Sequence, residues 1–274
     1  MKRTTTLAIV AALCLVLGAT PGPAQVTTEV TINGNQATAS VSTPLYGLDV
    51  TLTFEQAVGL STQTLGLSAA VVNPLDTELL ARLPTGVSVP AALPLLVAIE
   101  PPTSGGLSFA GVATLEIHTH DLEFLAGCPF RIFASHGGGP FEDVTDFMGM
   151  GSYRGRSRTG GFSDFLILAD TRAPGTVVDA KLDRLWGLLE DASDVIDYDV
   201  YSDLYQTLAA AEAAWGGGDT QTARDAMDTF ASAVLAASGS DIPDVWRSAR
   251  DLSNVAGELR SAAATLRFSL SLAS

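Results

Sequence analysis

Apolar and polar residues alternate through the first part of the chain. In the segment "GLDVTLTF" (47–54), Leu48, Val50, Leu52 and Phe54 share one face of an extended strand, because successive side chains point to opposite sides of a strand. The same period of two recurs in short segments that Gly and Pro clusters separate, at residues 26–32, 36–42, 64–72, 93–100, 112–120, 130–135, 151–158 and 162–169. Short strands at this spacing predict an antiparallel β-sandwich over residues 25–172.

The period changes to that of helices after Pro174 and Gly175. Apolar residues then recur at steps of three and four, which places them on one face of a helix. Three helices are expected to bury Leu182, Leu185, Trp186 and Leu189; Leu204, Leu208, Ala211 and Trp215; and Ala223, Met227, Phe230, Val234 and Ala237. At the start of the first helix, Thr176 with Asp179 resembles a capping box.

The last part of the chain predicts one more long helix. It would open at Asp241, ahead of Pro243, since proline is tolerated in a first turn. Its apolar seam steps by four and three through Val245, Ala249, Leu252, Ala256, Leu259, Ala263, Leu266 and Leu270, which is a heptad pattern. Together these segments predict an antiparallel bundle of about four helices over residues 176–274. The fold class is therefore α+β, with two domains that a short linker joins.

The N-terminus has the pattern of an export signal. Lys2 and Arg3 precede an apolar run, "LAIVAALCLVL" (7–17), which is too short to span a bilayer, and small residues follow up to Ala24. Residues 1–24 are therefore interpreted as a signal peptide. No second long apolar segment follows, so we expect a secreted or periplasmic protein without a membrane span in the mature chain.

Charge and cysteine content narrow the range of partners. The formal net charge is −15, which argues against binding to nucleic acid or to anionic membrane surfaces. Without the signal peptide, Lys181 is the only lysine and Cys128 the only cysteine. A single cysteine forms no internal disulfide, and we expect Cys128 to be a small buried residue.

Three stretches resemble known modules. "LSFAGVATLEIHTH" (107–120) and "PFRIFASHGGGPFEDVTDFMGMGSYRGRSRTGGFSDFLILADTR" (129–172) resemble the closing strands of sandwich modules in secreted bacterial proteins. "ARDAMDTFASAVLAASGSDIPDVWRSARDL" (223–252) is similar to helical modules of the FIVAR and FIMAH type. The combination resembles an uncharacterised family of exported bacterial proteins. This resemblance implies an accessory, adhesive or cell-surface role and carries over no catalytic residue.

His118 and His120 lie two residues apart in "LEIHTHDLEF" (115–124). On a strand both imidazoles share one face, and His136 could complete a three-nitrogen metal site with an open position for water. Glu123 invites comparison with the cupins, but its spacing from the second histidine differs and the later Gly-Pro motif of that family is missing. The interpretation we favour is a polar, solvent-facing side of a half-buried strand.

Arg154, Arg156 and Arg158 alternate along one strand, which places them on the same face. They form the only basic stripe of an acidic chain and could bind a carboxylate or sulfate on a glycan or partner, together with an exposed aromatic such as Tyr153. The acids available for ordinary pairing on the preceding segment are Glu142, Asp143 and Asp146. We favour this cross-strand pairing.

Two further patterns are set aside. Acids crowd residues 190–203, but the glycine and the terminal glutamate of an EF-hand are absent, so we assign these acids to helix caps and a solvated loop. "GMGSYRG" (149–155) lacks the strand-to-helix setting of a dinucleotide loop. The sequence contains no nucleophile elbow and no HExxH motif.

The sequence therefore predicts an exported, non-enzymatic binding or scaffolding protein that needs no cofactor. Its partner would be a protein or a glycan at the cell surface, in the periplasm or in the medium. One alternative is a metal-binding protein or metal-dependent enzyme that uses His118, His120 and His136. The other is a glycan-binding module that uses the Arg154, Arg156 and Arg158 face.

Overall fold

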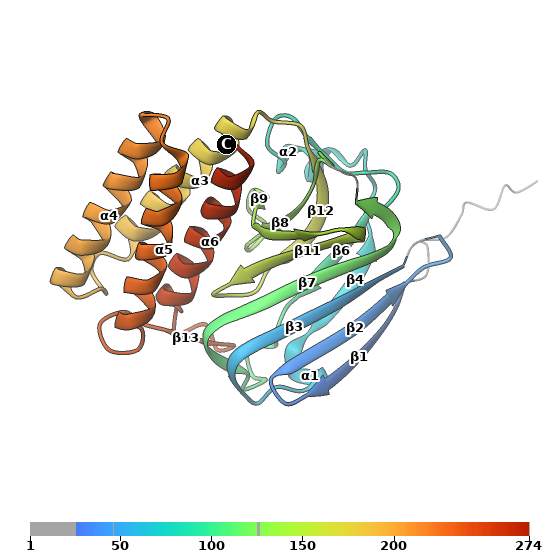
Figure 1. Ribbon diagram of the computed structural model, residues 1–274. Helices are drawn as coiled ribbons and strands as arrows, with labels where there is room; N and C mark the ends of the chain where they lie inside the picture. Colours follow the sequence, from blue (N-terminus) through green and yellow to red (C-terminus); the bar gives the residue numbers. More distant parts are fainter. Residues whose placement is uncertain (1–25, 46, 125–126, 274) are drawn as a thin grey trace, which may run out of the picture.

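The computed structural model describes residues 26–45, 47–124 and 127–273. The expected signal peptide lies outside these residues. The fold is α+β, with two antiparallel sheets and helices that are mostly C-terminal (Figure 1). None of the helices in the described part of the chain is long and apolar enough to span a membrane.

The larger sheet has seven strands, all antiparallel. Its order is β1 (Thr27–Asn33), β2 (Gln36–Ser42), β3 (Gly47–Val58), β7 (Ser108–Phe124), β11 (Gly151–Thr159) and β10 (Thr145–Gly149), with β13 (Val245–Arg247) added to β7. Strand β7 is the central strand of this sheet, because it pairs with β3, β11 and β13 along its length. The alternation predicted for β3 is confirmed: Leu48, Val50, Leu52 and Phe54 are all buried.

The second sheet packs its apolar face on the first. Its order is β4 (Leu67–Val71), β6 (Leu95–Ile99), β12 (Asp164–Asp170), β8 (Phe130–Ser135) and β9 (Glu142–Asp143), with β5 (Val87–Ser88) beside β12. The short helices α1 (Thr62–Leu65) and α2 (Thr77–Ala81) occupy connections. Cys128 is buried in the core between the sheets, as expected from the sequence.

Four long helices share a separate hydrophobic core. They are α3 (Pro174–Asp191), α4 (Tyr198–Gly216), α5 (Thr220–Ala237) and α6 (Val255–Leu272). All five residues expected on the buried stripe of α5, from Ala223 to Ala237, are buried. The period of the sequence therefore identified the buried face of this helix.

The prediction that the last helix begins near Asp241 is wrong. Residues 245–247 form strand β13, which pairs with β7, and the Trp246 ring lies 4.7 Å from that of Phe162. The helix begins only at Val255, where the Asn254 side chain accepts a hydrogen bond from the Gly257 amide at 2.8 Å. Burial of the indole among the aromatic rings of the sandwich outweighs the helical period of this segment.

The predicted capping box of α3 is also absent. This helix begins at Pro174, and its N-cap residue, Ala173, makes no side-chain hydrogen bond. Asp179 instead accepts a hydrogen bond from the Trp215 indole at 2.8 Å. Pro174 suits the first turn because its ring presets a helical φ and its missing N–H would have had no partner inside the helix.

Helix α6 joins the helices to the sheets. It lies between α5 and the strands β7, β10 and β11 (Figure 1). Three ion pairs cross the same boundary: Lys181 with Asp143 at 2.8 Å, Arg184 with Glu142 at 2.8 Å, and Arg260 with Glu55 at 2.7 Å. Side chains on α6 therefore pack on two sides, which positions a cavity at its N-terminal half.

Candidate functional site

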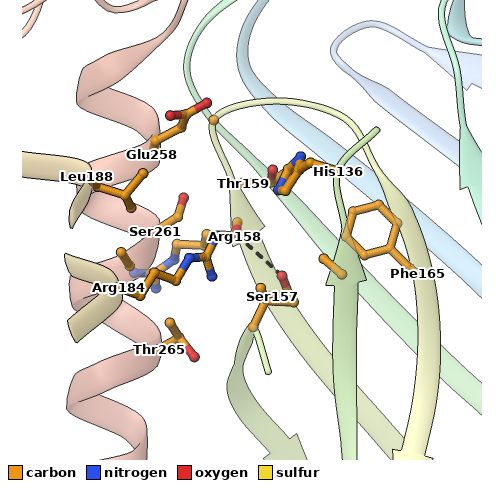
Figure 2. Close-up of a pocket in the computed structure, with 14 residues that line it drawn as sticks. His136, Ser157, Arg158, Thr159, Phe165, Arg184, Leu188, Glu258, Ser261 and Thr265 are labelled. Atoms are coloured by element: carbon orange, nitrogen blue, oxygen red, sulfur yellow. Dashed lines mark hydrogen bonds between the residues drawn. The ribbon is translucent and has the colours of Figure 1, made fainter. Parts of the chain in front are cut away.

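A cavity of about 200 Å³ lies where helices α3 and α6 meet the sandwich (Figure 2). Four ionisable side chains reach it from different elements: His136 after β8, Arg158 on β11, Arg184 on α3 and Glu258 in the first turn of α6. Phe165 and Leu188 form part of the apolar wall of the cavity. The cavity thus combines a few charged groups with apolar surface, as small-molecule sites do.

A glycine turn brings the sandwich close to the start of α6. Gly160 follows β11, and a Cβ added there would lie 2.4 Å from the Glu258 backbone nitrogen. The turn is held by Thr159, whose hydroxyl binds the carbonyl and the amide of Gly161. Because only glycine permits this approach, the turn places the Glu258 side chain at the rim of the cavity (Figure 2).

Glu258 is the unusual acid of this cavity. It is half-buried, and its carboxyl group makes no hydrogen bond or ion pair with protein groups in the described ranges. Burial raises the pKa of Glu258, and the nearby Arg184 charge opposes this effect only in part. A half-buried carboxyl group without a protein partner can accept a hydrogen bond from a ligand, or donate one when it is protonated.

The two arginines present guanidinium groups to the same space. Arg184 Nε lies 2.8 Å from Glu142 Oε2, and Arg158 Nε lies 3.2 Å from Asp146 Oδ2. Each guanidinium has five N–H donors, so one carboxylate does not use them all. The cavity is therefore suited to an anionic group next to a hydrogen-bonding group.

His136 is held at the mouth of the cavity by a hydroxyl group. Ser163 Oγ lies 2.7 Å from Nδ1 and 3.2 Å from Nε2, and the Phe162 carbonyl lies 3.3 Å from Nδ1. Desolvation lowers the pKa of His136, and the Arg184 charge adds to this effect. No carboxylate hydrogen-bonds the ring among the residues that the structure describes, so the pair lacks the third member of a Ser-His-Asp triad.

The three histidines do not gather at one point. His118 and His120 lie on β7 with ring centroids 6.0 Å apart, and His120 Nε2 lies 2.9 Å from Asp49 Oδ2. This hydrogen bond from His120 is the main reason why the pKa of Asp49 is lowered. His136 follows β8 in the other sheet. Within the described ranges, no group of three or more His, Cys, Asp or Glu side chains could hold a metal ion.

The three strand arginines have carboxylate partners. Arg154 pairs with Glu116 at 3.4 Å, and both Arg156 and Arg158 pair with Asp146 at 3.2 Å. Of the three acids expected as partners, only Asp146 serves them, because Glu142 binds Arg184 and Asp143 binds Lys181. Arg158 differs from the other two, since it also lines the cavity toward the helices. The expectation of an exposed Tyr153 is wrong, because this ring lies on the opposite, inward side of β11 and is fully buried.

Nothing in the sequence singled out Arg184 or Glu258. They lie on two helices, α3 and α6, whose apolar periodicity identifies only the side that packs against the other helices. The sequence indicates a second packing face on α6 only weakly, through small residues that let the helix approach β11. These residues are Gly257, Ser261 and Ala262. Small residues at such steps indicate close packing but do not indicate what packs there.

The fold and this cavity define an α+β protein in which a polar site lies between an antiparallel sandwich and a group of helices. The chain belongs to a family of unknown function, DUF6689, whose match covers residues 12–273. No curated protein and no solved structure matches the chain significantly.

Proposed function

We propose that this protein is an exported, non-enzymatic binding protein whose ligand occupies the cavity between β11 and helices α3 and α6. The observation that carries the proposal is the Glu258 carboxyl group, which is half-buried at the cavity wall without a protein partner among the described residues. Partial burial disfavours the charged form of this carboxyl group, and a hydrogen-bond donor or a cation beside it would offset that cost. A ligand supplies that partner.

The ligand is a small molecule with an anionic group and a hydrogen-bond donor. Its anionic group would face Arg158 and Arg184, and its donor, an ammonium or amide, would face Glu258 (Figure 2). Bidentate contacts from guanidinium groups suit a carboxylate. A cavity of about 200 Å³ is smaller than the usual pocket of about 300–1,000 Å³, so we infer a small ligand, such as a free amino acid.

The setting of this binding protein is a bacterial cell surface, the periplasm or the medium. The signal-peptide pattern of residues 1–24 supports export. The separate hydrophobic cores of the sheets and of the helices support a sandwich domain over 25–172, to which β13 adds a strand from the C-terminal part, and a four-helix bundle over 176–274. The bundle would then form one wall of the ligand site rather than act alone.

Calorimetric titration and thermal unfolding with a panel of free amino acids and small carboxylates test this proposal. We expect at least one compound to bind saturably and to raise the melting temperature, as any ligand of the native state does. Glu258→Gln should weaken that binding by about tenfold or more, the usual effect of losing a hydrogen bond to a charged group.

A matched control distinguishes an effect of the cavity from an effect of the overall change in net charge. Glu190 is an exposed acid on α3, and Glu190→Gln makes the same change of charge away from the cavity. Equal affinities of the two variants, or no binding by any compound of the panel at millimolar concentration, would contradict the proposal.

A further inference from the structure

A second hollow lies on the other side of Arg158. It has a volume of about 240 Å³ and lies between α5, α6 and strands β10 and β11. Its charged lining consists of Arg158, Arg224, Arg267, Asp146 and Asp228. Three guanidinium groups therefore face two carboxylates in a protein whose net charge is −15.

The pairing in this hollow leaves positive charge uncompensated. Arg267 pairs with Asp228 at 2.6 Å, while Asp146 is shared between Arg158 and Arg156. Arg224 has no carboxylate partner in the part of the chain that the structure describes. Its guanidinium donates a hydrogen bond of 3.4 Å to the Gln221 side chain, and the Asp225 carboxylate beside it accepts one from Gln221.

The hollow also contains buried polar atoms without hydrogen bonds. These atoms are Arg224 Nε, Arg267 Nε and Asp146 Oδ2. Arg267 Nε is close to a carboxylate oxygen but not directed at it. Two buried N–H donors that point at no acceptor are costly in a folded protein, and an acceptor from outside would satisfy both.

We propose that this hollow is a binding site for an oxyanion group, a sulfate, phosphate or carboxylate, held by Arg224 and Arg267 with Arg158 beside them. Guanidinium groups bind such groups through pairs of parallel N–H bonds. The site goes beyond the proposed cavity function, because it needs neither Glu258 nor Arg184. The source of the oxyanion is either a free ion or a substituent on a sugar.

Arginine Nε–H resonances in nitrogen-15 spectra test the site directly. The wild-type protein is titrated with sodium sulfate, sodium phosphate and a sulfated disaccharide, with ionic strength held constant by sodium chloride. We expect saturable shifts of the Arg224 and Arg267 Nε signals, while the Arg172 Nε signal, which is held by Asp170 at 2.9 Å, stays in place. Absence of a saturable shift with all three probes would overturn the proposal.

Matched variants measure the contribution of each arginine. Arg224→Gln and Arg267→Gln should each weaken binding by about tenfold or more, whereas Arg247→Gln, which removes an exposed guanidinium paired with Asp251, should leave it unchanged. If Arg224→Gln does not fold, Arg224→Lys keeps the charge without the forked donors and should still bind more weakly. Equal affinity of the Arg224 and Arg247 variants would overturn the proposal. Tighter binding of the disaccharide than of sulfate would assign the oxyanion to a sugar, and equal binding to a free ion.

Discussion

Lys181 Nζ lies 2.8 Å from Asp143 Oδ2, and the two side chains are 5% and 3% exposed. The same ammonium group donates to the Thr265 hydroxyl at 2.5 Å, and that hydroxyl donates to the Thr145 carbonyl at 2.8 Å. The only lysine outside the expected signal peptide therefore joins α3, α6 and the edge of the sandwich through groups that water does not reach.

Removal of either charge should destabilise the protein strongly. Lys181→Met or Asp143→Asn leaves the other charge buried without its partner, and we expect a loss of about 3–5 kcal/mol in the free energy of unfolding, measured in urea. The double variant Lys181→Met/Asp143→Leu should recover much of this loss, because it leaves no buried charge. A single variant that costs less than about 1 kcal/mol would show that water reaches the pair.

The same pair predicts a loss of stability in acid. Burial alone would raise the pKa of Asp143, but Lys181 beside it and the hydrogen bonds from Thr145 outweigh burial and lower the pKa below its ordinary value of 3.8. The contribution of this carboxylate is thus complete above pH 3.8 and is lost as the pH falls through the lowered value. In Asp143→Asn, this part of the acid dependence should be missing from unfolding curves.

Trp246 should stabilise the whole molecule rather than one part of it. Its ring packs against Phe109 and Phe162 although it belongs to the C-terminal part of the chain. We expect Trp246→Ala to cost about 3 kcal/mol, the low end for a large aromatic, since the residue is only partly buried. Circular dichroism should show one transition for sheets and helices together, and Trp246→Phe should restore most of the loss. Two separate transitions would contradict a shared unfolding unit.

Glu258 should make the protein less stable as the pH rises. Burial raises its folded pKa above 4.5, so the folded state binds more protons than the unfolded state between 4.5 and that value. The free energy of unfolding therefore falls as the pH rises through this window. Glu258→Gln should have a higher melting temperature than the wild type at pH 7, and the difference should vanish below pH 4.5. A difference that does not change with pH would contradict the assignment.

Gly160 and Gly187 form a matched pair for the contact between β11 and α6. An added methyl at Gly160 meets the α6 backbone at 2.4 Å, whereas nothing lies within 4 Å of one at Gly187 in α3. We expect Gly160→Ala to destabilise by about 1–3 kcal/mol and Gly187→Ala to stabilise by about 0.5–1 kcal/mol. Urea unfolding of both variants measures this. If the Gly160 variant is as stable as the wild type, the turn and the helix do not touch as described.

Periodicity in the sequence is enough to identify which side of a helix or strand is buried. The buried stripe of α5 and the inward side of β3 follow directly from periods of 3.6 and two, because a helix or strand positions its side chains by geometry that needs no neighbour. The shared face of Arg154, Arg156 and Arg158 follows for the same reason. Of the three acids expected to pair with it, only Asp146 does so, and Arg154 pairs with Glu116 instead.

Which elements pack against those buried sides depends on the tertiary structure. The heptad steps from Val245 to Leu252 suit a helix, but the free energy of burying Trp246 in the sandwich made a strand there. His136 and Glu258 are far apart in the sequence, and the cavity that they share exists because α6 packs on β11 through a glycine turn. Local periods carry no information about such partners, because packing between distant segments depends on shape and burial across the whole chain.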